Sequence, residues 1–254
     1  MFRLDGKVAV ITGGGSGIGR AVAMLFARQG AVVHIVDLSE QNALQVLAEI
    51  EGEGGKAFVH TCDVSNQQQV KEVFEQIQGL NILVNNAGVA HVGNVINTTE
   101  EDFDRIYKIN VKGAYNCLQA GVRLMQAGGG GAIVNLSSVA ALVGITDRFA
   151  YSMSKGAIHA MSLSVAKDFL QAGIRSNTIS PARVHTPFVD GFIAKNYPGK
   201  EAEMFEKLSK SQPVGRMGTV EEIAKLILYL SSDDASFITG NDYPIDGGFV
   251  TLNS

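Results

Sequence analysis

Two side chains with complementary acid–base chemistry, Tyr151 and Lys155, lie four residues apart. At the start of a helical pattern this spacing places both on one face of the helix. A free tyrosine has a pKa of about 10 and is a poor base near neutrality, but a neighbouring ammonium favours the phenolate. Such a pair can remove the proton of an alcohol. Because Tyr and Lys often occur at this spacing in helices, an ordinary helix surface is the alternative interpretation.

A serine near this pair could take part in the same chemistry. Ser138 lies 13 residues before Tyr151, after the predicted strand Ala132–Leu136. The carboxyl edge of an open α/β sheet is where ligands bind, and a hydroxyl there can hold a substrate oxygen while its charge develops. Turn chemistry after the strand is the alternative for Ser137 and Ser138.

A glycine-rich segment, TGGGSGIG at 12–19, lies between the first apolar run and the first helical pattern. A pyrophosphate needs close backbone approach and free N–H groups at a helix N-terminus, and glycine permits that approach. Asp37 ends the next apolar run, 18 residues after Gly19. Together these features predict a dinucleotide site, with a tight structural turn as the alternative.

The acidic residue Asp37 favours NAD over NADP. Its carboxylate can accept hydrogen bonds from ribose hydroxyls, and it would repel a 2′-phosphate. Gly15 and Ser16 stand where an NADP site would carry Lys or Arg, and Leu38 and Ser39 are neutral. A helix cap for the segment that starts at Ser39 is the alternative role for Asp37.

Strand-length apolar runs alternate with longer segments of helical period, which indicates βαβ units. The runs are nearly continuous in apolar residues, as expected for a parallel sheet covered by helices on both faces. They are Val8–Thr12, Val32–Asp37, Ala57–Thr61, Ile82–Asn85, Ala132–Leu136, Arg175–Ser180 and Tyr243–Ile245. We therefore expect an α/β fold, with one doubly wound domain over residues 1–254 and a mostly parallel seven-stranded sheet.

Helix boundaries are marked at three points. Gly30 stands where the first helix should stop. Thr98 with Glu101, and Thr219 with Glu222, have the spacing of capping boxes before helical patterns.

The least regular part of the chain is the segment 187–210, which carries several aromatic residues. Two interpretations remain open for it. One is an amphipathic helix pair packed on the core, and the other is a mobile lid over a pocket.

Composition excludes several classes of protein. The 254 residues include 46% hydrophobic and 18% charged residues and carry a net charge of −4 without blocks of like charge. This argues against nucleic acid as a partner.

The sequence has neither a signal-peptide core at its start nor a run of about 18 apolar residues. Cys62 and Cys117 lack the spacing of a metal or redox motif and are expected to be buried thiols. We expect a cytoplasmic protein with a small-molecule partner, no metal, no nucleic acid and no membrane.

Several motifs occur together in one order along nearly the whole chain. They are TGGGSGIG at 12–19, Asp63-Val64, NNAG at 85–88, Asn110 in KINVKG, NLSS at 135–138, YSMSK at 151–155 and TG with DGG at 239–248. In this combination the chain resembles the short-chain dehydrogenase/reductase family, whose fold is of the Rossmann type.

The resemblance implies a catalytic tetrad of Asn110, Ser138, Tyr151 and Lys155. Asn110 would hold a water that relays protons to Lys155, and Lys155, beside Tyr151, would also bind the nicotinamide ribose. The implied cofactor contacts are Gly13, Ser16, Ile18 and Gly19 at the pyrophosphate and its ribose, Asp63 and Val64 at the adenine, Asn86 and Gly88 on the adenosine side, and Val184 and Thr186 at the nicotinamide amide.

The sequence departs from the family pattern at one place. The family usually has Pro-Gly where this chain reads Pro181-Ala182-Arg183-Val184. Alanine restricts the backbone where glycine could take a positive φ. Arg183 is an unexpected cation there, for which a solvated surface side chain is the alternative. The resemblance also suggests a homotetramer or homodimer formed through long helices near 111–126 and 151–170.

These features predict an NAD-dependent dehydrogenase that oxidises a secondary alcohol to a ketone, with Tyr151 as general base. The alternatives are an NADP-dependent ketoacyl or ketone reductase and a catalytically silent dinucleotide sensor. Arg148, three residues before Tyr151, could bind a substrate carboxylate, and the alternative is that it pairs with Asp147 or with a partner subunit. HVGN at 91–94 with DRFAYS at 147–152 is similar to family members that act on hydroxy acids and sugar acids. That similarity would place His91 in the same pocket, with a loop histidine whose hydrogen bonds are satisfied locally as the alternative.

Overall fold

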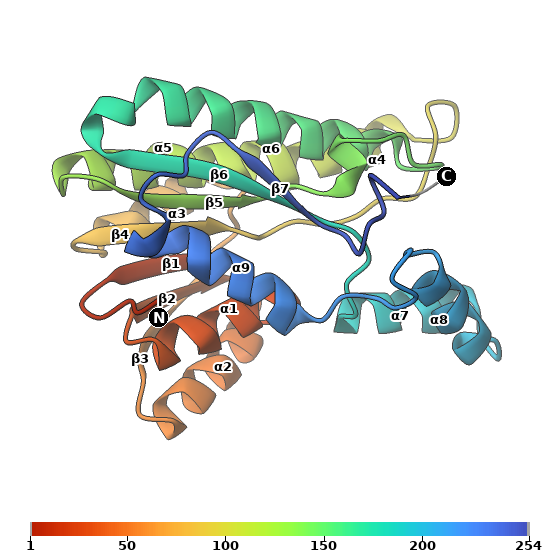
Figure 1. The fold of residues 1–254 in the computed structure, drawn as a ribbon, viewed down its shortest axis with the longest axis horizontal. Coiled ribbons are helices and arrows are strands. Elements are labelled where there is room, and N and C mark those ends of the chain that lie inside the picture. The colour runs from red at the N-terminus through yellow and green to blue at the C-terminus, as the bar shows by residue number, and fades with distance from the viewer. Residues whose placement is uncertain (1, 253–254) are drawn as a thin grey trace.

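Within the described residues, seven parallel strands form one sheet at the centre of the molecule (Figure 1). The computed structural model describes residues 2–252, with the backbone alone at 188, 195 and 196. The strands are β1 (Val8–Thr12), β2 (Val32–Asp37), β3 (Lys56–Thr61), β4 (Leu80–Asn85), β5 (Gly131–Leu136), β6 (Ile174–Pro181) and β7 (Asp242–Ile245). Their order across the sheet is β3-β2-β1-β4-β5-β6-β7, which confirms the predicted doubly wound parallel sheet.

Helices cover both faces of this sheet (Figure 1). One face packs against α1 (Gly17–Arg28), α2 (Glu40–Gly52) and α9 (Val220–Ser231), and the other against α3 (Gln67–Glu75), α5 (Gly113–Ala127) and α6 (Phe149–Asp168). The remaining helices are α4 (Glu100–Ile106), α7 (Pro187–Asn196) and α8 (Glu201–Lys210). Two apolar cores result, one on each side of the sheet. Because both faces are covered, the middle parts of β1 and β4 are continuous in buried apolar residues, whereas β6 also buries the polar residues Ser176, Asn177 and Thr178.

The strand order reverses between β1 and β4. From β1 the chain winds outward to β3, then returns to β4 on the other side of β1. The loops after β1 and β4 therefore diverge at the carboxyl edge of the sheet, and this switch point is where an open α/β sheet binds its ligand.

The capping prediction is confirmed at one helix and wrong at another. At α9 the Thr219 hydroxyl accepts a hydrogen bond from the Glu222 amide at 3.2 Å, and the Glu222 carboxylate accepts one from the Thr219 amide at 2.8 Å. At α4 the cap is Thr99 rather than Thr98, because the helix begins one residue later and the Thr99 hydroxyl accepts from the Asp102 amide at 3.1 Å.

The segment 187–210 forms two helices, α7 and α8, which project beyond the end of the sheet (Figure 1). Its side chains at 188, 195 and 196 lie outside the described residues. Whether the pair moves as a lid stays a prediction. So does self-association through α5 and α6, on which the half-exposed Tyr115 and Leu163 lie.

Both cysteines are buried and unpaired, as their spacing predicted. Burial raises the pKa of Cys62 to about 11, so its thiol stays protonated and unreactive near neutral pH. Within residues 2–252, no helix is both long enough and apolar enough to cross a membrane.

Candidate active site

A cavity of about 900 Å³ opens at the carboxyl edge of the sheet, across the switch point. It draws its lining from the loops after β1, β2, β3, β4, β5 and β6 and from the first turns of α6. Most of the residues predicted to bind cofactor or substrate line it: Gly13, Ser16, Ile18, Asp37, Asp63, Val64, Asn86, Gly88, Ser138, Arg148, Tyr151, Lys155, Val184 and Thr186. The fold thus brings one cavity together from segments up to 236 residues apart, from Gly13 to Phe249.

The glycine loop forms the floor of one end of this cavity. Gly13 has a φ of +64°, and a Cβ on it would lie 2.9 Å from Asn86 Nδ2. Asn86 Nδ2 donates to the carbonyls of Thr12 and Gly13 at 3.0 and 3.1 Å, which fixes the loop against β4. Gly19 does not line the cavity; it packs so tightly beneath Gly13 that any side chain would collide with the Gly13 carbonyl. Both positions therefore require glycine.

The loop ends at the N-terminus of α1, where Ser16 is the N-cap. Its side chain makes no capping hydrogen bond, so the first amides of α1 keep their donors for another acceptor. Free N–H groups at a helix N-terminus bind phosphate oxygens. The loop and the helix end together can receive a pyrophosphate.

Asp37 lies at the end of β2 beside this loop. Its Oδ2 accepts a hydrogen bond from the Gly15 amide at 2.8 Å, and its Oδ1 accepts one from the Ser39 amide at 2.9 Å. The helix-cap alternative does not hold, because Ser39 itself caps α2 by accepting from the Asn42 amide. A carboxylate held at the cavity wall beside the glycine loop fits the adenosine ribose of a dinucleotide.

Tyr151 and Lys155 lie on one face of the first turns of α6, as predicted from their spacing. Lys155 Nζ lies 5.7 Å from the centre of the Tyr151 ring and donates to the Leu136 carbonyl at 2.6 Å. Burial lowers the pKa of Lys155 to about 8. Burial raises the pKa of Tyr151, while a hydrogen bond from Ser138 and the positive charge of Arg148 oppose that rise.

The two serines after β5 differ in role. The Ser137 hydroxyl donates to the Lys155 carbonyl at 3.1 Å and ties β5 to α6. The Ser138 hydroxyl accepts from the Ala140 amide at 3.2 Å, so it has the turn chemistry expected after a strand. Ser138 also lines the cavity beside Tyr151, and this places it to contact a bound substrate.

Asn110 is fully buried and does not line the cavity. It lies in a π-helical turn, Tyr107–Lys112, that joins α4 to α5. Its Oδ1 accepts from the Val89 amide at 2.8 Å, and its Nδ2 donates to the Val89 carbonyl at 2.9 Å and to Ser154 Oγ at 3.0 Å. Asn110 therefore fixes the loop after β4 against α6. π-Helical turns often occur at functional sites.

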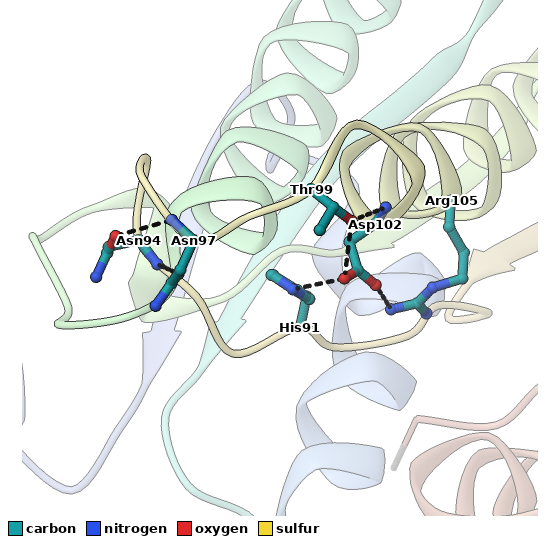
Figure 2. Close-up of polar contacts among 6 residues, drawn as sticks. All are labelled: His91, Asn94, Asn97, Thr99, Asp102 and Arg105. Atoms are coloured by element: carbon teal, nitrogen blue, oxygen red, sulfur yellow. Dashed lines mark hydrogen bonds and ion pairs between the residues drawn. The ribbon is translucent and has the colours of Figure 1, made fainter.

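His91 does not line the cavity, so the expectation that it shares a pocket with Arg148 is wrong. Figure 2 shows its ring directed at the first turn of α4, with Nε2 3.4 Å from Asp102 Oδ2. Arg105 donates to the other oxygen of Asp102 at 3.1 Å, and this contact lowers the pKa of that carboxyl. The ring turns away because the loop that carries it is anchored to α4.

The same loop does position Arg148. The Gly93 amide donates to the Asp147 carbonyl, and the Phe149 amide donates to the Gly93 carbonyl, both at 3.0 Å. This bridge holds the segment that enters α6, and Arg148 extends from it to line the cavity. One of its terminal amino groups, Nη1, donates to the Asp147 carbonyl at 2.9 Å.

Arg183 and Gln212 are among the cavity residues that were not predicted as ligands. Arg183 is half-buried and lines the cavity, which excludes the solvated surface position considered for it. Gln212, from the segment after α8, is buried and lines it as well. The departure from Pro-Gly could have marked Arg183 as a cavity residue. No feature of the sequence marks Gln212 in this way.

Known proteins resemble this chain in sequence and in fold. A family described as Enoyl-(Acyl carrier protein) reductase matches residues 13–250. An uncharacterised oxidoreductase of Thermotoga maritima is 42% identical over 99% of this chain and its own full length. A short-chain type dehydrogenase/reductase from Mycobacterium marinum is 34% identical with a TM-score of 0.91, covering 98% of both chains. The chain belongs to the short-chain dehydrogenase/reductase family.

A second similar structure is a gluconate 5-dehydrogenase from Burkholderia cenocepacia in complex with NADP and tartrate. It is 30% identical, with a TM-score of 0.90 and coverage of 98% of this chain and 97% of its own. As a short-chain dehydrogenase/reductase, the protein is an oxidoreductase of alcohols and ketones that binds a nicotinamide dinucleotide.

The buried Lys155 of this short-chain dehydrogenase/reductase predicts a pH-dependent stability. Its pKa is about 8 in the folded protein and 10.5 in its ordinary state, so between these values the unfolded chain binds a proton that the folded protein does not. Stability contributed by this site therefore rises with pH from 8 to 10. Relative to Lys155→Met, we expect the wild-type free energy of unfolding to gain about 2–3 kcal/mol between pH 7 and 10.

Urea unfolding at pH 7, 8, 9 and 10 measures this difference, with the exposed Lys167→Met as control. Parallel stability profiles of wild type and Lys155→Met would show that the folded protein does not lower the pKa of Lys155. Measurements above pH 10 are left out because Tyr151, whose pKa is raised, then changes stability in the opposite direction.

Proposed function

We propose that this protein is an NAD-dependent dehydrogenase that oxidises a secondary alcohol to a ketone, and that the alcohol belongs to an acid. The observation that carries the proposal is the shared cavity. Tyr151, Ser138 and Lys155, whose side chains can transfer a proton, line it together with the glycine loop and the carboxylate of Asp37, which fit a dinucleotide.

The chain's own residues supply the proton transfer. The Ser138 hydroxyl holds the substrate oxygen, and Tyr151 accepts its proton as general base. Lys155 lies beside the Tyr151 ring, and its positive charge favours the phenolate when it is protonated. A nicotinamide dinucleotide held by the glycine loop, Asp37, Asp63 and Asn86 supplies the hydride acceptor. Asn110 acts indirectly, because it holds the loop at Val89 and the helix α6 at Ser154 in place.

Asp37 supports NAD as the cofactor. Its carboxylate stands where a 2′-phosphate would bring two negative charges, and like charges in contact cost several kcal/mol. The gluconate 5-dehydrogenase in complex with NADP shows that a similar protein can bind the phosphorylated cofactor. The choice between NAD and NADP therefore depends on the residue of this chain beside the glycine loop, Asp37.

We expect NAD to bind roughly 10- to 100-fold more tightly than NADP, equivalent to about 1.4–2.8 kcal/mol. Asp37→Asn keeps the shape of the side chain and removes the charge, so it should weaken NAD and strengthen NADP. Fluorescence titration with NADH and NADPH measures both affinities. Asp168→Asn, at an exposed position on α6, is the matched control. A wild-type protein that prefers NADPH would overturn the cofactor assignment.

Arg148 supports an acid as the substrate. Its guanidinium lines the cavity within reach of Tyr151, whose pKa its positive charge lowers. A guanidinium binds a carboxylate through two parallel hydrogen bonds. The tartrate bound to the similar gluconate 5-dehydrogenase is itself a hydroxy acid, which is consistent with this class of substrate.

A further inference from the structure

A second guanidinium stands near Arg148 in the cavity. Arg183 follows β6, and its backbone is fixed because the Gly218 amide donates to the Arg183 carbonyl at 2.9 Å. Its side chain is fixed as well, because Nε donates to Ser211 Oγ at 3.0 Å. The position of this cation is therefore set by the segment that follows α8 and by the turn before α9.

Most donors of the two arginines have no acceptor on the protein. Among residues 2–252, the side chain of Arg183 donates only through Nε and that of Arg148 only through Nη1. The carboxylates that line the cavity, Asp37, Asp63 and Glu101, form no ion pair with either arginine. Both terminal amino groups of Arg183 therefore remain for a ligand.

The two cations also repel each other. Burial lowers the pKa of Arg183, and the positive charge of Arg148 lowers it further. Two like charges in a half-buried cavity destabilise each other unless an anion lies between them. This end of the cavity is electrostatically suited to a negatively charged group.

A buried amide lies next to this cation. The Ser211 hydroxyl donates to the Leu208 carbonyl at 2.6 Å, so Ser211 Oγ can only accept from Arg183 and from Gln212 Nε2, each at 3.0 Å. This fixes the orientation of the Gln212 amide. Its Oε1 is left buried without a hydrogen-bond partner among the described residues, in a side chain that is 2% exposed and lines the cavity.

A buried acceptor without a donor carries a desolvation cost that a ligand hydroxyl can remove. Because Ser211 contacts both side chains, this acceptor lies close to the Arg183 guanidinium. A ligand that satisfies both must carry a hydroxyl near its negative group. Simple hydroxy fatty acids, whose one hydroxyl is the group to be oxidised at Tyr151, lack it.

We propose that Arg183 and Arg148 together bind the substrate carboxylate, that Gln212 Oε1 accepts a hydrogen bond from a second hydroxyl near it, and that the substrate is a polyhydroxylated acid. This inference rests on the proposed alcohol oxidation at Tyr151. It assigns Arg183 and Gln212 as residues that determine substrate specificity.

The binding of hydroxy acids to the enzyme loaded with NADH tests the inference without requiring the reaction to occur. A hydroxy acid cannot be oxidised by the reduced cofactor, so calorimetry can measure the dissociation constant of this complex. The probes are D-gluconate, D-galactonate and D-xylonate, with 3-hydroxybutyrate as the acid that lacks further hydroxyls. We expect the best aldonate to bind about tenfold or more tighter than 3-hydroxybutyrate, equivalent to about 1.4 kcal/mol.

Variants distinguish the proposed contact of the carboxylate with Arg183 from the proposed contact of the second hydroxyl with Gln212. Arg183→Met should weaken both kinds of acid by about tenfold or more, because each loses a charged partner. Arg183→Lys should lie between that variant and wild type, and the surface variant Arg28→Met should match wild type. Gln212→Met should weaken aldonates alone. The comparison of acids on the wild-type enzyme needs no variant and stands if Gln212→Met does not fold.

The outcomes distinguish this inference from the proposed function. If the wild-type enzyme oxidises neutral secondary alcohols with NAD but binds aldonates no tighter than 3-hydroxybutyrate, the inference is wrong and alcohol oxidation stands. If Arg183→Met binds every acid as the wild type does, Arg183 is not a ligand. If aldonates bind through Arg183 but no alcohol or acid is oxidised with NAD or NADP, the site stands and the proposed reaction is wrong.

Discussion

We expect Tyr151→Phe to lower kcat for alcohol oxidation by about 10³-fold, within the range that a general base contributes. The substitution removes one hydroxyl and keeps the ring that packs beside Lys155. The glycine loop and Asp37 are untouched, so the affinity for NADH should stay within a few-fold of wild type. Steady-state kinetics and fluorescence titration on the same preparation measure both quantities.

The pH profile makes this test sharper. In the wild type, kcat/KM for oxidation should rise with pH until the site that contains Tyr151 has lost its proton. Because Tyr151 and Lys155 interact, the observed pKa belongs to the pair. Tyr115→Phe removes a hydroxyl on the half-exposed surface of α5 and should leave the profile as it is. Unchanged turnover in Tyr151→Phe would contradict the assignment of the base.

The strands and the cofactor end of the cavity could be predicted because short-range signals specify them. The apolar run Val8–Thr12 has the same bounds as β1, because the inner residues of this strand are all apolar and buried. The glycine loop was recognisable because close backbone approach at Gly13 and Gly19 tolerates no side chain. Tyr151 and Lys155 share a face simply because helix geometry places residues four apart together.

The end of the cavity that holds Arg148 and Arg183 could be predicted only in part, because its side chains depend on contacts between distant segments. His91 and Arg148 both lie in loops, and no local pattern states which way a loop side chain points. The structure turns His91 toward Asp102, in the first turn of α4, and leaves Arg148 in the cavity. Gln212 enters the site through Ser211, which also holds Arg183 from 28 residues earlier in the chain.

The surroundings of Asn110 could not be predicted from the sequence either. The resemblance to the family gave its identity but not its surroundings, which depend on a π-helical turn with no distinctive sequence pattern. In that turn its amide is occupied by Val89 and Ser154. Its contribution is therefore expected to come through the positions of those two neighbours.

Arg148→Met should lower kcat/KM for a carboxylated substrate by tens to hundreds of fold, as expected for losing about 2–3 kcal/mol of a charge-assisted contact. The guanidinium lines the cavity and keeps donors without a protein acceptor among the described residues. Methionine fills a similar volume and cannot bind a carboxylate. Arg148→Lys should recover only part of the activity, because an ammonium lacks the planar fork that matches a carboxylate.

Neutral alcohols separate the binding role of Arg148 from its effect on Tyr151. The positive charge of Arg148 lowers the pKa of Tyr151, so Arg148→Met should move the pH profile upward for every substrate. At a pH above that shift, neutral alcohols should regain wild-type kcat/KM, whereas acids should remain impaired because their partner is gone. Arg28→Met, which removes an exposed guanidinium on α1, controls for the change in net charge. If acids are oxidised equally well by wild type and Arg148→Met at every pH, Arg148 serves only to hold the turn at Asp147, and the substrate is bound by other groups.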